Sequence, residues 1–191
     1  MKSVLISIQP KWCELIADGK KTIEVRKTRP KLETPFKCYI YETKAYDTLF
    51  GKGKPKKLCV SGGRVIGEFV CDRVEQGHIL WVKEQPEYYD KVEETTQLTY
   101  RQMFDYLGES GVGYFWHISD LVIYDKPREL SEFYVEGDCD CMNCKKCYWF
   151  DRGNGYNVEN DCNLAYKCVE LHKSFKPIIR PPQSWCYVEV E

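Results

Sequence analysis

Short β-branched segments, set apart by turn-forming residues, constrain the fold of this chain more than any other feature. Runs of β-branched or alternating apolar residues predict strands over 4–9, 36–43, 64–77, 113–127 and 184–190. Helical patterns separate few of these strands, which argues against a doubly wound parallel sheet. The sequence therefore predicts an α+β, mainly β fold, in which an antiparallel, curled sheet or small β-barrel carries short flanking helices.

Two segments have the residue pattern of short helices. Residues 10–19 begin with Pro10 and end with Gly19, the residues favoured at the start and just past the end of a helix. Residues 98–111 carry an apolar stripe and reach Gly108, which suits a helix C-terminus. Each helix is expected to pack an apolar face inward.

The segment 19–29, GKKTIEVRKTR, is dense in charge and yet has strand-like alternation. Successive side chains of a strand point to opposite faces. Ile23 and Val25 would then share one face, with Lys21 at its end, and the other face would carry Thr22, Glu24 and Arg26. An exposed ion pair contributes only ~0–1 kcal/mol, so stability alone is a weak reason for such a strand.

Two interpretations of this charged strand are open, a solvated edge strand or the wall of a ligand cleft. In the second, Arg26 would hold a phosphate or carboxylate in a bidentate grip, and Lys21 would act as a point charge or proton carrier. The chain has a net charge of −1, but residues 20–57 contain ten lysines and two arginines against four acidic residues. This asymmetry, which includes the loop GKGKPKK at 51–57, predicts an anion-facing side, with a solvated basic face as the alternative.

Six of the eleven cysteines crowd between positions 139 and 168, in a Gly-, Asn- and Asp-rich segment with little periodicity. The pattern predicts an insertion over 136–176 in a domain formed by 1–135 and 177–191. C-x2-C spacing lets two thiolates hold one ion, and four thiolates complete a tetrahedral zinc site. The preferred ligands of a structural zinc ion are Cys144, Cys147, Cys162 and Cys168. Cys139 and Cys141 are alternates or a second partial site, and a two-zinc cluster, an iron–sulfur cluster and free thiols are further alternatives.

The other five cysteines lie among apolar residues and are interpreted as small core residues: Cys13, Cys38, Cys59, Cys71 and Cys186. His117 is interpreted as a packing or hydrogen-bonded histidine, and a catalytic pair with Asp120 is the alternative. The sequence has no apolar run of about 18 residues and no apolar core of a signal peptide near its first residue. We therefore expect a cytoplasmic protein with no membrane partner.

The run from Gly19 to Arg26 matches the signature G-x-K-x-x-E-x-R, and through it the chain resembles the ASCH domain family. Residues 4–31, 114–133 and 180–190 are also similar to bacterial and prophage ASCH proteins. The family consists of PUA-like β-barrels linked to RNA binding and processing. The resemblance implies a barrel cleft in which Lys21, Thr22, Glu24 and Arg26 bind RNA or a nucleotide.

The resemblance leaves open whether the protein is an enzyme. One ASCH branch comprises amidohydrolases that act on 4-acetylcytidine, using a lysine and a threonine of the motif and a more distant glutamate. Lys21 matches the lysine, the threonine position holds Glu24, and Glu94 is a loose match for the glutamate. Lys21 and Glu24 would be the catalytic residues of such an enzyme, and other family members cleave RNA. A third hypothesis is an interaction protein whose Cys-rich insertion binds a protein partner.

Overall fold

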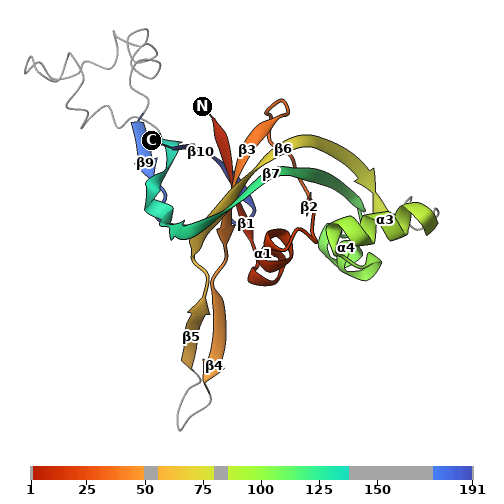
Figure 1. The fold of residues 1–191 in the computed structure, drawn as a ribbon, viewed down its shortest axis with the longest axis horizontal. Coiled ribbons are helices and arrows are strands. Elements are labelled where there is room, and N and C mark those ends of the chain that lie inside the picture. The colour runs from red at the N-terminus through yellow and green to blue at the C-terminus, as the bar shows by residue number, and fades with distance from the viewer. Residues whose placement is uncertain (1, 50–55, 80–85, 138–173, 191) are drawn as a thin grey trace, which may run out of the picture.

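A computed structural model describes residues 2–49, 56–79, 86–137 and 174–190 (Figure 1). In chain order its elements are β1 (Ser3–Ile8), α1 (Pro10–Ala17), β2 (Ile23–Arg26), β3 (Phe36–Glu42), β4 (Ala45–Leu49), β5 (Lys56–Ser61), β6 (Arg64–His78), α3 (Pro86–Thr96), α4 (Tyr100–Leu107), β7 (Val112–Arg128), the 3-10 helix η1 (Leu130–Glu132), β8 (Phe133–Gly137), β9 (Ser174–Pro177) and β10 (Trp185–Val190). The prediction of a mainly β chain with short helices is confirmed.

Eight strands form one curled sheet in the order β2-β7-β6-β3-β1-β10-β8-β9. Strands β1 and β3 run parallel, and the other neighbours in this sheet run antiparallel. Within the described residues, no pairing joins the two end strands, β2 and β9. The curled antiparallel sheet agrees with the sequence-based expectation, whereas the described sheet is open and does not close into a barrel.

The alternation of β3 supplies two hydrophobic cores, one on each face of the sheet. Cys38 and Ile40 belong to one core, in which Ile16 of α1 is fully buried. Tyr39 belongs to the other core and packs edge-on against Phe133 at a ring-centroid distance of 5.0 Å. A third cluster joins α3 and α4 to the strands that carry the candidate site.

Both predicted helices are present, with the expected end residues. Pro10 occupies the first turn of α1, and Gly19 follows its C-terminus with φ of 70°. Helix α4 begins with a capping box between Thr99 and Gln102, which satisfies backbone N–H groups at its start. The apolar stripe expected on this helix included Met103, Phe104 and Leu107. Met103 and Leu107 are buried, but Phe104 is 40% exposed, so the prediction is only partly correct.

Helix α3 was not predicted. Its sequence, PEYYDKVEETT, has few apolar residues, and the described part of it buries Val92 and Thr96. Such a helix depends on tertiary contacts more than on a periodic pattern. No helix in the described ranges has the length and apolar character needed to cross a bilayer.

Three of the five cysteines interpreted as core residues are buried: Cys13, Cys38 and Cys71. Burial raises the pKa of the Cys71 thiol to about 12, so it stays protonated near neutral pH. Cys186 is half-buried, and the side chain of Cys59 lies outside the described residues.

The predicted insertion, 136–176, starts within β8 and ends within β9, and residues 138–173 lie outside the described residues. At the boundary Gly137 pairs with Ser174, so the chain leaves and re-enters the sheet at adjacent positions.

Strands β4 and β5 form a separate two-stranded sheet, which projects from the body of the molecule (Figure 1). The basic loop expected over 51–57 overlaps this hairpin: Lys56 and Lys57 begin β5, and residues 51–55 lie outside the described residues.

Candidate functional site

The charged motif forms the edge strand β2 and the turn that leads into it. Strand β2 begins at Ile23, and Glu24 pairs with Trp116 of β7. Lys21 precedes the strand, where its backbone N–H donates to the carbonyl of Leu15 at the end of α1. Strand alternation therefore does not extend to Lys21. The prediction that Lys21 shares the face of Ile23 is wrong, because its ammonium turns toward Glu24.

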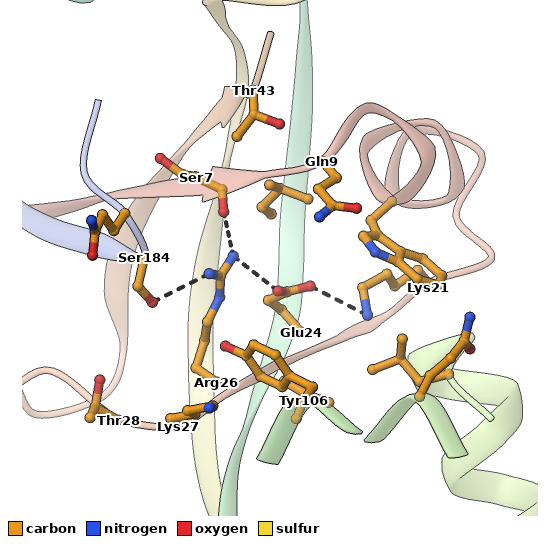
Figure 2. A pocket seen from close by; sticks show the side chains of 16 residues that line it. Ser7, Gln9, Lys21, Glu24, Arg26, Lys27, Thr28, Thr43, Tyr106 and Ser184 are labelled. Carbon is orange, nitrogen blue, oxygen red and sulfur yellow. Dashed lines mark hydrogen bonds and ion pairs between the residues drawn. The ribbon is translucent and has the colours of Figure 1, made fainter. Parts of the chain in front are cut away.

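Glu24 bridges two cations at the centre of the site (Figure 2). Its Oε2 lies 3.3 Å from Nζ of Lys21, and its Oε1 lies 3.0 Å from Nη2 of Arg26. All three residues are buried, with 2% of Lys21, 7% of Glu24 and 6% of Arg26 exposed. The solvated-strand interpretation is therefore wrong. Because each of the three buried charges has a partner of opposite sign, the attraction between them offsets the cost of removing them from water.

Lys21 uses all three of its N–H donors inside the protein. Besides Glu24, it donates to the carbonyl of Ile23 at 2.8 Å and to that of Thr96 at 2.7 Å. Thr96 is the last residue of α3, so a positive charge lies where the helix dipole is negative. Burial lowers the pKa of Lys21 below its ordinary value, and Glu24 opposes this shift.

Arg26 joins three separate parts of the chain. Its Nη2 donates to the carbonyl of Ser7 in β1 at 2.6 Å, and its Nη1 donates to Oγ of Ser184, before β10, at 3.3 Å. Its Nε is buried and has no hydrogen-bond partner among the described residues. The guanidinium therefore fixes the distance between strands that are far apart in the sequence.

These three charged residues lie at a pocket of about 740 Å³ (Figure 2). The lining includes three cations and one carboxylate, because Lys27 joins the charged group. Two aromatic residues, Trp12 and Tyr106, also line the pocket, and Nζ of Lys27 lies 5.3 Å from the ring centroid of Tyr106. The excess of positive charge favours an anionic ligand, and the aromatic rings offer stacking surfaces.

Sequence reasoning missed most of the remaining lining residues: Ser7, Gln9, Thr43, Leu98, Gln102, Gln183 and Ser184, as well as the pocket role of Tyr106. They come from segments that are distant in the chain, and no motif connects them. The one available signal was the apolar stripe of residues 98–111, which predicted a helix but not a pocket wall.

Several other candidates lie away from the pocket. Thr22 is exposed, is not among the lining residues, and contacts its neighbours through its backbone. Glu94 is exposed on α3 and does not line the pocket. His117 has Nε2 3.0 Å from Oε2 of Glu75 and contacts Arg73, which fits the hydrogen-bonded interpretation and not a pair with Asp120.

The predicted zinc ligands, Cys144, Cys147, Cys162 and Cys168, lie outside the described residues, as do Cys139 and Cys141. Within 2–49, 56–79, 86–137 and 174–190, no group of three or more His, Cys, Asp or Glu residues is placed to hold a metal ion.

An open, curled β-sheet with a charged pocket beside its edge strand defines a small β-domain with one candidate site among the described residues. The model of the ASCH domain matches residues 6–126, and the chain belongs to this family. No curated protein matches the sequence.

Solved structures show the same fold. The ASCH protein of Zymomonas mobilis is 16% identical, with a TM-score of 0.54, over 98% of this chain and 87% of that one. Its serine-to-alanine variant gives the same identity and TM-score over 98% and 88%. Its tyrosine-to-phenylalanine variant is 20% identical, with a TM-score of 0.50, over 68% and 77%.

Proposed function

We propose that this protein is an RNA- or nucleotide-binding ASCH module that holds its ligand in the charged pocket. The observation that carries the proposal is the buried group of Lys21, Glu24 and Arg26 at a pocket of about 740 Å³. A pocket of this volume lies in the range of small-molecule sites. Membership of the ASCH family, which the sequence resemblance links to RNA, supports a nucleic-acid ligand.

The chemistry of the lining suits a nucleotide. Lys27 and Arg26 would attract a phosphate, while the rings of Trp12 and Tyr106 would stack on a base. Amide side chains, such as that of Gln183, provide both donors and acceptors for a base edge. The ligand would thus be held by charge at one end and by stacking at the other.

The members of the charged group have different roles in this proposal. Only 1% of the Lys21 side chain is exposed, against 10% for Glu24 and 8% for Arg26. Lys21 therefore orients Glu24 and the end of α3, and Glu24 in turn holds Arg26 in place. Direct ligand contact falls to the more exposed lining residues around them, such as Lys27, and Arg26 adds its positive charge from behind.

Amidohydrolase or RNase activity is the alternative, with Lys21 and Glu24 as its catalytic residues. The geometry favours it less. A lysine that acts as a nucleophile or general base needs a free electron pair, whereas all three N–H groups of Lys21 are donated within the protein. Glu24 also stands where the amidohydrolase branch has a threonine.

We also propose a structural zinc ion bound by Cys144, Cys147, Cys162 and Cys168, on the basis of their spacing. With four thiolate ligands the ion would be closed to substrate, and it would hold the Cys-rich segment together. That segment could then present a surface to a protein partner.

Binding measurements test the proposal that the charged pocket holds RNA or a nucleotide. Fluorescence anisotropy should show binding of single-stranded RNA and of nucleoside monophosphates, with an affinity that falls as salt rises. The same samples, incubated with RNA and with acetylated cytidine, separate binding from catalysis. Turnover of either substrate would favour the enzyme hypothesis over the binding-module hypothesis. Binding that is absent, or that does not depend on salt, would show that the pocket is not an anion site.

A further inference from the structure

We propose that the β4–β5 hairpin is a second contact site for the RNA held in the pocket, so that the ligand is a polynucleotide and not a single nucleotide. This inference rests on the proposed function. The hairpin arm is defined here by its described residues, 44–49 and 56–61.

The arm stands apart from the hydrophobic cores. Among the described residues, β4 and β5 pair only with each other and form their own sheet, which projects from the body (Figure 1). A two-stranded hairpin without further packing is marginally stable in water. Its presence is therefore poorly explained by the stability of the domain, and a contact role explains it better.

The base of the arm is fixed to the wall of the pocket. Thr43 lines the pocket, and its N–H donates to the carbonyl of Ile8 at 2.8 Å. On the returning strand, the N–H of Gly63 donates to the carbonyl of Glu42 at 2.8 Å. Gly62 has φ of 79°, and a Cβ there would clash with the carbonyl oxygen of Thr43, so the outgoing and returning strands lie close together where the arm begins. Thr43 therefore joins the lining of the pocket directly to the first strand of the arm.

The sequence of the arm is basic, as expected of a segment that binds a polyanion. Over 44–49 and 56–61 it has three lysines, Lys44, Lys56 and Lys57, against one acidic residue, Asp47. The side chain of Lys44 is exposed, and those of the other three lie outside the described residues. Tyr46 is 54% exposed and offers a ring on which a base can stack. Both strands are edges of their two-stranded sheet, and lysines on edge strands oppose pairing with another protein strand. The composition therefore favours RNA over a protein partner.

The size of the arm sets the minimum length of the ligand. The five residues of β4 rise about 16 Å at the usual spacing of a β-strand. A single nucleotide in the pocket cannot also reach along this distance. A single strand several nucleotides long can contact both, and small β-folds bind such strands over about 4–16 nucleotides.

The experiment compares a nucleoside monophosphate with a single-stranded RNA of about ten nucleotides, within the footprint of small β-folds. The arm variant carries Lys44→Gln, Lys56→Gln and Lys57→Gln. The control removes the same charge from exposed lysines of α3, β7 and β9, through Lys91→Gln, Lys126→Gln and Lys176→Gln. A second variant, Tyr46→Ala, removes the exposed ring and no charge.

The wild-type protein should bind the RNA more tightly than the monophosphate. The arm variant should lower the slope of log affinity against log salt by about 2, near 0.7 for each phosphate contact. Tyr46→Ala should weaken RNA binding by about fivefold or more, the effect of one stacked base. Neither variant should change monophosphate binding or the melting temperature.

Each other outcome counts against the inference. If the arm variant and its control lowered RNA affinity equally, the effect would come from the overall charge of the protein and not from a contact with the arm. A changed oligomeric state in Tyr46→Ala would make the arm a protein contact. Monophosphate binding with no gain for RNA would reject the arm and leave the pocket proposal standing. Failure of the wild-type protein to bind either ligand would reject both.

Discussion

The ammonium of Lys21 lies 2.7 Å from the carbonyl oxygen of Thr96, the last residue of α3. The same ammonium lies 3.3 Å from Glu24. One buried side chain therefore links the charged strand to the helix that precedes α4, and α4 supplies Gln102 and Tyr106 to the pocket.

The first prediction concerns the stability that this link provides. Lys21→Met should lower the free energy of unfolding by about 3–5 kcal/mol, because it leaves Glu24 with one cation fewer in a buried setting. Urea unfolding measures the change. Lys20→Met is the control, since Lys20 is exposed and pairs with Asp18 at the surface, so its effect should stay below about 1 kcal/mol. Similar losses in the two variants would show that the buried link adds nothing.

The second prediction is that Lys21 and Glu24 act as a pair. Glu24→Gln alone should destabilise the protein, because two buried cations lose their shared counter-ion. The double variant should cost less than the sum of the two single variants, by about 0.5–3 kcal/mol. A double-mutant cycle in urea unfolding measures this coupling, and strict additivity would contradict it.

The third prediction concerns the contribution of Glu68 on β6 to stability in acid. Burial alone would raise the pKa of Glu68, but hydrogen bonds from Lys37 at 2.7 Å and Tyr124 at 2.6 Å leave it below the ordinary value. A carboxyl whose folded pKa is lowered stabilises the protein above its unfolded pKa, about 4.3, and loses that contribution as pH falls through the folded value. Glu68→Gln should therefore be less stable than wild type at pH 7, and the difference should shrink below about pH 4.

Unfolding curves across the acid range test this shift. Glu109→Gln, at an exposed position after α4, is the control and should track the wild-type curve. A constant gap between wild type and Glu68→Gln down to low pH would mean that the lowered pKa does not contribute to stability.

The fourth prediction separates stacking from charge in the pocket. Tyr106→Ala should weaken nucleotide binding by about 1–3 kcal/mol, the usual value for loss of one stacked base, with little change in salt dependence. Lys27→Ala should weaken it and lower the salt slope by about 0.7. Both side chains are exposed at the pocket, so the fold should survive, and Lys126→Ala serves as the control. Anisotropy titrations at several salt concentrations distinguish the two effects.

The fifth prediction concerns metal. Elemental analysis of the untagged protein should give about one zinc ion per chain, the stoichiometry of a single tetrahedral site. Replacing residues 138–173 by Asn-Gly, a turn suited to a two-residue hairpin, should remove the zinc and leave the circular dichroism of the sheet in place. Zinc that persists in this variant would place the site elsewhere, and none in the full chain would refute the zinc site.

The regular elements were predictable where local chemistry decides them. Pro10 and Gly19 marked the ends of α1, and the alternation of β3 separated the two cores. In the long strand β6 the register of pairing with β7 shifts between Val65 and Gly67, at a glycine that the sequence itself displays. Each of these features follows from residues within a few positions of one another.

The site was predictable only in part. The motif identified Glu24 and Arg26, but strand alternation misplaced Lys21, because hydrogen bonds to the end of α1 hold it outside β2. Partners such as Ser7 and Ser184 reach Arg26 through the arrangement of distant strands. Contacts of this kind depend on the assembled sheet, and a single sequence has no local signal for them.

The pairing of Gly137 with Ser174 has a consequence for the history of the chain. A segment whose two ends meet on neighbouring strands can be gained, lost or exchanged between proteins without changing the path of the sheet on either side. The Cys-rich segment and the pocket can therefore be selected independently, and related chains can differ in the first while they share the second.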